Sequence, residues 1–401
     1  MSELSPYRRV HADPADWFDA EEIDRGRAYV RPIRRLQHVR TVLSTAVLLA
    51  FVVGDAAPRL LAALDLRGWV LELLVVTLAF FVADLGVSTW FDAWRELVWD
   101  KRWEMSTQTV RGFVLDQVRG LVFVALTFAL VLPLWALIRA TDLWWLYGWL
   151  VLAAFAVAAN TLGPVLIAPM FNKYTPMEDP QLRERLLDVA RTAELDVSEV
   201  LVADQSRRSN AINAHVAGLG KTRRVVVFDT LLDWPPEFLE QIIGHELGHW
   251  RYKHVRRRIP VLVAAQGLGL VLTAVVTRWD WVLEGAGVPS LQSPAALPLF
   301  LLVFQLGFLL TSLVTSWLSR ADERASDIYA LDLLRDPDAF AGAFRKLAEA
   351  NNAEVDPPLW KRITHTHPPI AERVAMAARW KERNLVESPS ATDGNSTKFV
   401  S

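Results

Sequence analysis

The stretch LVFVALTFALVLPLWALI, residues Leu121–Ile138, contains no charged side chain. An uncharged apolar run of about 18 residues is long enough to cross a bilayer as an α-helix, because each residue advances the helix by ~1.5 Å. Similar runs recur along the chain, one of them shorter and one interrupted by a charge. The other predicted spans are Thr41–Val53, Leu73–Phe91, Leu143–Asn172, Ile259–Thr277 and Gly285–Ser319. These runs predict an α-helical polytopic membrane protein with about six transmembrane helices.

The composition excludes several classes of protein. Of the 401 residues, 52% are hydrophobic and 22% are charged, which is too apolar for a disordered chain. A formal net charge of −2 gives no basic character, so no nucleic-acid partner is expected. There is no cysteine, so a metal must be held by nitrogen and oxygen ligands. The polar N-terminus has no apolar core after its basic residues, so no cleavable signal peptide is expected.

The charges between the predicted spans indicate the orientation of the chain. Lysine and arginine gather in alternate loops, and the loops between these carry few of them. The basic residues concerned are Arg31, Arg34, Arg35, Arg40, Arg95, Lys101, Arg102, Arg111, Arg119, Lys253, Arg256, Arg257 and Arg258. Because cytoplasmic loops carry the excess of positive charge, both termini are expected inside. Residues 173–258 and the chain after Arg320 then lie in the cytosol.

The segment between the fourth and fifth spans has the pattern of a small folded unit. Residues 178–195, EDPQLRERLLDVARTAEL, have the leucine spacing of a helix, and residues 197–204 and 223–232 are rich in β-branched side chains. These patterns predict a small α+β insertion. Asp84, inside the second span, is either a buried structural contact or part of an internal polar cavity, because an ionisable group at membrane depth faces protein or water.

The stretch QIIGHELGHW, residues Gln241–Trp250, has the metal-binding pattern HExxH. Its histidines, His245 and His249, are four residues apart and share one face of a helix, and Glu246 between them can accept a proton from water. An HExxH match alone is also compatible with a helix that carries two partly exposed histidines. A third ligand is needed to distinguish the two interpretations.

A carboxylate pair downstream supplies that ligand. In SRADERASD, residues 319–327, Glu323 and Asp327 lie one helical turn apart just after the last predicted span. Two histidines and one carboxylate, with a fourth position open for water, form a ligand set expected for catalytic zinc, and Asp327 would orient a ligand histidine through its other ring nitrogen. A solvated charged helix end is the alternative for this segment. It is disfavoured because His249 and Glu323 are predicted near the same membrane face.

Four stretches together resemble the type I CAAX prenyl protease family of integral-membrane zinc metalloproteases. They are RRSNAINAHVAGLGKTRRVVVFDTLL, IIGHELGHWRYKH, SRADERASD and THTHPPIAERV, and they have the order and spacing of that family. Eukaryotic members similar to this chain begin with one more span, so six spans rather than seven are expected. The 17 tryptophans and the short chain are typical of a bacterial homologue. Bacteria generally lack prenylated CAAX proteins, so the substrate does not follow from the resemblance.

The resemblance implies roles for individual residues. It implies zinc ligation by His245, His249 and Glu323, general-base catalysis by Glu246, orientation of a ligand by Asp327, contact of His367 with substrate or the developing oxyanion, support of the site by Arg373, and a substrate-binding edge strand at Asn213. From the residues alone, a histidine before Pro-Pro is also compatible with a solvated loop. His215, His254 and His365 are interpreted as structural or interfacial.

These patterns together predict a membrane-embedded zinc metalloendopeptidase that cleaves membrane-associated or unfolded chains. The alternatives are a heat-shock-type membrane quality-control metalloprotease and a non-catalytic membrane transporter or scaffold stabilised by zinc. We expect the chain to bind one Zn²⁺ ion and a peptide or protein substrate, and to contact the lipid bilayer. The expected location is a bacterial inner membrane, with the site on its cytosolic side. The predicted units are a cytosolic segment (1–40), spans one to four (41–172), the metalloprotease region (173–258), spans five and six (259–319), a C-terminal catalytic region (320–386) and a disordered tail (387–401).

Overall fold

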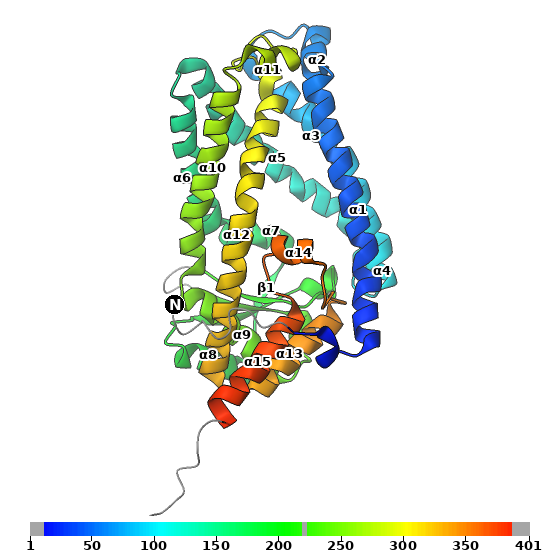
Figure 1. Cartoon of the computed structure of the whole chain (residues 1–401), viewed down its shortest axis with the longest axis vertical. Coiled ribbons are helices and arrows are strands. Elements are labelled where there is room, and N and C mark those ends of the chain that lie inside the picture. The colour runs from blue at the N-terminus through cyan, green and yellow to red at the C-terminus, as the bar shows by residue number, and fades with distance from the viewer. Residues whose placement is uncertain (1–11, 219–222, 387–401) are drawn as a thin grey trace, which may run out of the picture.

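The computed structural model describes residues 12–218 and 223–386, in which long helices stand above a smaller mixed unit (Figure 1). Six helical stretches are long and apolar enough to cross a membrane. They contain α1 (Ala20–Val53), α3 (Trp69–Trp94), α5 (Val110–Ala140), α6 (Trp144–Leu166), α10 (His254–Val276) and α12 (Leu297–Leu334). Large apolar side chains remain exposed on them, such as Leu309 and Leu310 of α12, which are 66% and 65% exposed. The predicted fold class, a polytopic helical protein with a small sheet-containing unit, is confirmed.

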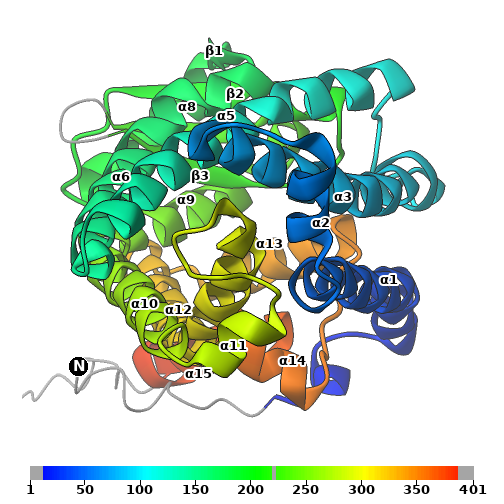
Figure 2. The same ribbon diagram turned by 90° about the horizontal axis from the view of Figure 1, so that it is seen from above.

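Seen from above, the six long helices stand around a ring in the order α1, α3, α5, α6, α10 and α12 (Figure 2). Each helix contacts the next, and α12 contacts α1. At the upper end, Trp135, Leu73 and Leu297 belong to one buried apolar cluster. The short helices α2 (Ala56–Leu64) and α11 (Asp280–Gly285) also lie there. This cluster joins the ends of the helices that are furthest from the mixed unit.

The sixth span begins later than the sequence predicts, and its helix continues past the predicted end at Ser319 to Leu334. The uncharged run begins at Gly285, but α12 begins only at Leu297, after a 3-10 turn at Pro294–Ala296. Residues 286–293 lack regular structure, and Val288 and Leu291 are buried in the upper cluster. The run is apolar there because protein covers it, and prolines in this segment disfavour an earlier helix start.

Other helix ends also differ from the predicted ones. The first helix begins at Ala20 instead of Thr41, where Asp19 and Glu22 form a capping box. The fourth ends at Leu166, and a short helix α7 (Ala168–Phe171) follows. α3 continues through a π-helical turn (Arg95–Trp99) into α4 (Asp100–Arg102). Asp84 is a contact between spans, because its Oδ1 accepts a hydrogen bond of 2.7 Å from Ser44 Oγ on α1.

The mixed unit is built on a four-stranded sheet in the order β1-β2-β4-β3. The strands are β1 (Tyr174–Pro176), β2 (Glu199–Ala203), β3 (Ala214–Ala217) and β4 (Arg224–Phe228). β2 and β4 pair in parallel, while β1 and β3 are antiparallel edge strands. Helices α8 (Pro180–Thr192) and α9 (Pro236–Arg251) bury Leu186, Ile243 and Leu247 against the sheet. The predicted helix at 178–195 and the two predicted strands are confirmed. The predicted tail, 387–401, lies outside the described residues.

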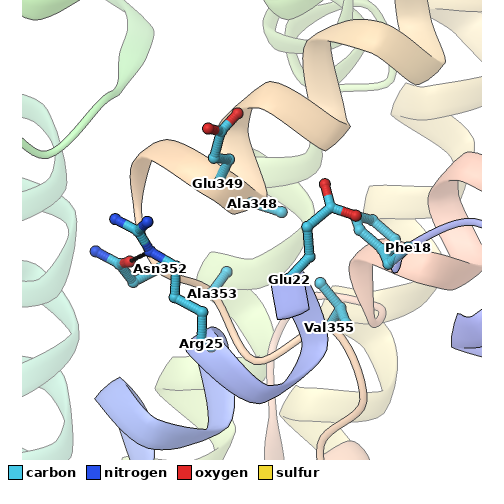
Figure 3. A pocket seen from close by; sticks show the side chains of 9 residues that line it. Phe18, Glu22, Arg25, Ala348, Glu349, Asn352, Ala353 and Val355 are labelled. Atoms are coloured by element: carbon cyan, nitrogen blue, oxygen red, sulfur yellow. Dashed lines mark hydrogen bonds between the residues drawn. The ribbon is translucent and has the colours of Figure 1, made fainter. Parts of the chain in front are cut away.

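Three C-terminal helices complete the unit. They are α13 (Pro337–Ala350), α14 (Leu359–Thr364) and α15 (Ile370–Lys381). α13 and α15 lie below the sheet, and α14 lies higher up beside α12 (Figure 1). The start of α1 packs against the end of α13 around a small pocket (Figure 3). Arg25 points at Asn352 there, and Phe18 lines the pocket. Arg25 Nε donates a 2.8 Å hydrogen bond to Asn352 Oδ1. A Cβ on Gly26 would lie 2.2 Å from the Ala353 carbonyl oxygen, so this close approach requires glycine.

Candidate metal centre and cleft

Two helices cross closely enough to bring the HExxH histidines to the distal glutamate. His245 and His249 lie on α9, and Glu323 lies on α12. A Cβ on Gly248 would lie 2.9 Å from Ser326 Cα, so the glycine lets the two backbones approach. Pro236 in the first turn starts α9, and the apolar face of this helix is held by the sheet core. The histidines therefore project from the edge of α9 that faces α12.

The donor atoms of the three side chains converge on one point. The Nε2 atoms of His245 and His249 are 3.2 Å apart, and each lies 3.3 Å from an oxygen of Glu323. Four tetrahedral ligands at the usual zinc distances are separated by about 3.3 Å from each other. Oε2 of Glu323 is buried and accepts no hydrogen bond, although His367 Nδ1 lies 2.8 Å from it. The three residues thus fit a metal ion in both spacing and donor chemistry.

Asp327 and Arg373 hold the far side of the His245 ring. Asp327 Oδ1 lies 2.7 Å from His245 Nδ1, and the Asp327 side chain is fully buried. Arg373, on α15, donates from Nε to Asp327 Oδ2 at 2.9 Å and from Nη2 to Oδ1. Its guanidinium lies 3.8 Å from the centre of the Phe344 ring. A carboxylate in this position fixes the proton on Nδ1 and leaves the Nε2 lone pair for a metal.

The surroundings of α9 shift the pKa values of two neighbouring groups. Burial lowers the pKa of His245, but the charge of Asp327 and the hydrogen bonds to Asp327 and Glu323 together outweigh burial and raise the pKa to about 9. Burial raises the pKa of Glu246, and the adjacent imidazoles oppose that shift. A metal that binds His245 therefore competes with a proton. A carboxyl group whose pKa moves toward neutrality is a better proton acceptor and donor near pH 7.

A cleft of about 280 Å³ opens beside these groups. Its walls come from the start of β3, from α9, α12 and α13, and from the loop before α15. Six of the eight predicted site residues line it, namely Asn213, His245, Glu246, Glu323, His367 and Arg373. His249 and Asp327 lie behind this surface. The His367 side chain is 63% exposed, so it is open to a molecule in the cleft. The structure thus brings all eight residues to one site.

Some residues at the site were not expected from the sequence. Phe344, Leu347 and Asn351 line the cleft from α13 and the residue after it. Asn351 Oδ1 accepts a 3.1 Å hydrogen bond from Ile212 N–H, next to the start of β3. His254, interpreted as structural, lies 3.0 Å from His249 through their Nδ1 atoms. Its position five residues after His249 is the only sequence signal that points to it.

Two family models match the chain in succession. The model described as "CAAX prenyl protease N-terminal, five membrane helices" matches residues 5–173, which contain four of the six candidate spans. The model of peptidase family M48 matches residues 176–381, which contain the whole metal centre and cleft. The boundary between the two matches falls where the last of these four spans gives way to the sheet.

Individual proteins resemble the chain over most of its length. The uncharacterized metalloprotease YhfN of Bacillus subtilis is 31% identical over 300 residues, which are 72% of this chain and 69% of YhfN. A protein named CAAX prenyl protease 1 homolog from Arabidopsis thaliana is 28% identical over 390 residues, 88% of this chain and 87% of the plant protein. The crystal structure of S. mikatae Ste24p is similar in fold, with a TM-score of 0.77, 21% identity and 93% coverage of both chains.

Proposed function

We propose, from the premise that the chain belongs to peptidase family M48, that one zinc ion held by His245, His249 and Glu323 serves its reaction. The chain is a multi-pass membrane metalloendopeptidase that acts on a peptide or protein substrate. The observation that carries the choice of ligands is the spacing of 3.2 to 3.3 Å between their donor atoms. A bound zinc ion supplies a Lewis acid that polarises the scissile carbonyl and lowers the pKa of water.

Within this proposal, Glu246 is the general base. It follows His245 in the chain and lines the cleft beside the three ligand side chains. Burial raises its pKa, which suits a group that accepts a proton from the attacking water and returns it to the leaving amine near neutral pH. Asp327 and Arg373 keep His245 in one tautomer and orientation. His367 is exposed in the cleft, where it can donate a hydrogen bond to the carbonyl oxygen as negative charge develops.

We propose that the substrate backbone adds to the edge strand β3. Phe228 N–H donates to the Asn213 carbonyl, so the alternation of an antiparallel ladder turns the backbone of Ala214 and Val216 toward the open edge. Trp250 Nε1 donates to the Val216 carbonyl at 3.3 Å, which limits how far a substrate pairs along this edge. Asn213 and Ala214 also line the cleft. An extended peptide pairing at Ala214 would therefore enter the cleft beside Glu246.

We propose extended segments of membrane-associated or unfolded proteins as the substrate class. Several similar proteins carry the name CAAX prenyl protease, and the quality-control activity predicted as an alternative uses the same site on a different substrate. The bilayer lies around the long helices. We place the chain in a bacterial inner membrane with the cleft in the cytosol, which the basic loops and the similarity to the Bacillus protein support.

The orientation is tested by labelling. Single cysteines replacing Glu178 and Glu284, both exposed, should react from opposite sides of the membrane, the first from the cytosol. The chain has no cysteine of its own, so the parent protein is an unlabelled control. Labelling of the Glu178→Cys protein from outside the cell would overturn the proposed orientation.

The catalytic assignment is tested by Glu246→Gln in the purified full chain. Zinc content is measured together with cleavage of an internally quenched peptide. We expect bound zinc to stay at the parental level and kcat/KM to fall by at least ~10²-fold, because glutamine cannot accept the proton. Glu323→Ala should lose zinc and activity together. Near-parental cleavage by the Glu246→Gln protein would overturn its role as the base, and full zinc occupancy in the Glu323→Ala protein would overturn the ligand set.

A further inference from the structure

We propose that His254 is a positioning residue for the metal ligand His249, with its own orientation set by Asp322. The inference rests on the proposed function, because it takes His249 to be a metal ligand. His254 is the first residue of α10 and is 2% exposed. Its ring meets that of His249 edge to face, with the centres 5.1 Å apart. Lys253, which has a left-handed φ of 56°, forms the sharp turn between α9 and α10 that brings His254 back onto His249.

The hydrogen-bonding capacity of the two rings leaves one consistent arrangement of protons. His249 Nε2 lies 3.3 Å from Glu323 and must keep its lone pair free to bind a metal. A neutral imidazole then carries its proton on Nδ1. His254 Nδ1 lies 3.0 Å from that nitrogen, so it has to be the acceptor. Its remaining proton must therefore sit on Nε2.

The groups around His254 suit this tautomer. Asp322 Oδ1 lies 3.5 Å from His254 Nε2 and can accept its proton. Arg258 Nε holds the other oxygen of Asp322 at 2.8 Å, so the carboxylate is fixed from its far side. Ser326 Oγ lies 3.5 Å from His254 Nδ1, at the limit of a hydrogen bond. The ring of Tyr252 stacks at 5.6 Å and 27° to that of His254. Neutral His254 thus completes a chain of donors and acceptors that runs from Arg258 to His249.

The two ligand histidines are held in different ways. Nδ1 of His245 meets the carboxylate of Asp327 directly, at 2.7 Å. Nδ1 of His249 meets the neutral ring of His254. The carboxylate of Asp322 lies on the other side of that ring and does not meet His249 directly. Both carboxylates come from α12, within about one and a half helical turns. Partners of this kind set the tautomer and angle of a ligand histidine, and their loss typically costs ~10–100-fold in metal affinity.

The test compares two substitutions of His254, one that removes the hydrogen-bond acceptor for His249 and one that keeps it. His254→Phe keeps a buried ring and removes the acceptor, whereas His254→Asn presents a side-chain oxygen near the position of Nδ1. Zinc affinity is measured by chelator competition on the full chain in micelles, and the visible spectrum of the Co²⁺-substituted protein reports the ligand geometry. We expect a ~10–100-fold weaker zinc affinity and an altered Co²⁺ spectrum for His254→Phe. The His254→Asn protein should stay within a few-fold of the parent. His38→Phe, on the exposed face of α1, controls for the loss of one histidine.

Two results would overturn the inference. One is parental zinc affinity in the His254→Phe protein, and the other is an equal loss in the Phe and Asn variants, which would indicate packing instead of hydrogen bonding. If His254→Phe does not fold, Asp322→Ala decides, because it removes the acceptor for His254 Nε2–H. An unchanged Co²⁺ spectrum and zinc affinity in that protein would also contradict the proposed chain of hydrogen bonds. His249→Ala separates the two proposals: retained zinc in that protein would overturn the ligand set itself, while lost zinc beside an unaffected His254→Phe protein would overturn only the role of His254.

Discussion

Replacing Gly248 by alanine should push α9 away from α12 and thereby weaken metal binding. Gly248 lies between the two metal-ligand positions of α9, on the side that faces α12. A Cβ built there would lie 2.9 Å from Ser326 Cα and 3.2 Å from the Ser326 carbonyl oxygen. Ordinary contacts of a Cβ lie at 3.4 Å or more, so α9 and α12 must separate by at least 3.4 − 2.9 = 0.5 Å. The atoms in the way are backbone, which cannot move aside as a flexible side chain does.

The same displacement acts on the ligands, because His249 follows Gly248 directly and Glu323 lies on the same helix as Ser326. Ligand distances of a zinc site vary by only ~0.2 Å. We therefore expect zinc affinity to fall by ~10–100-fold, comparable to the loss of an orienting residue, and kcat/KM to fall by up to ~10²-fold. Overpacking also costs about 1–3 kcal/mol of stability. Chelator competition, peptide cleavage and thermal unfolding in micelles measure the three effects.

Gly244 provides a matched control one turn earlier on the same helix. A Cβ there would meet Leu334 Cδ1 at 3.1 Å, the far end of a flexible side chain, and Ala330 Cβ at 3.4 Å. Both substitutions gain the same helix propensity, about 1 kcal/mol. Gly244→Ala should therefore bind zinc as the parent does. Equal zinc affinities in the two alanine variants and the parent would refute the reasoning that the backbone contact at Ser326 sets the ligand spacing.

Three further predictions concern the buried groups around His245. Asp327→Asn should weaken zinc binding by ~10–100-fold in chelator competition. Arg373→Ala leaves the Asp327 charge without its bidentate partner and should lower the unfolding free energy by about 3–5 kcal/mol, seen by denaturation in micelles. Burial lowers the pKa of His245, but Asp327 and Glu323 together raise it to about 9, above the usual 6.5. The metal-free protein should therefore be most stable below about pH 6.5 and lose up to about 3 kcal/mol as the pH rises through 9. Thermal unfolding of chelator-treated protein against pH checks this, and the zinc-loaded protein should lack the trend.

Much of the architecture follows from patterns that depend on the local chain alone. A run without charges that is long enough to cross a bilayer is typical of membrane-spanning helices, and HExxH fixes two side chains on one helix face by periodicity. The predicted ends of the spans were wrong where an apolar run had a cause other than contact with lipid. Residues 286–293 are apolar because they are buried at the upper end of the bundle, and a sequence does not distinguish burial in protein from burial in lipid. The charged residues Arg31 to Arg40 lie on a helix and not in a loop, since α1 begins at Ala20.

The part of the site that escaped prediction depends on contacts between helices. Glu323 and Asp327 were found because they share a motif and a helix face. His254 was missed because its role requires a turn at Lys253 and the arrival of Asp322 from a helix far along the chain. The cleft residues Phe344 and Leu347 have the spacing of an ordinary apolar helix face, so nothing in the sequence separates them from core residues. Sequence identifies groups with distinctive chemistry, and packing decides which ordinary groups join them.

The heights at which His254 and Asp322 lie are set by packing between two of the candidate membrane spans. α10 and α12 touch backbone to backbone, because a Cβ on Gly307 would lie 2.6 Å from Gly269 Cα. The two helices run in opposite directions along the bundle, α10 away from the mixed unit and α12 toward it (Figure 1). On α10, His254 lies 269 − 254 = 15 residues before Gly269. On α12, Asp322 lies 322 − 307 = 15 residues after Gly307. Both stretches are helical and span about 22 Å, so the glycine contact brings His254 level with Asp322, and Glu323 follows at the level of His249. A small-residue contact between two candidate spans thereby fixes the height at which the metal ligands meet.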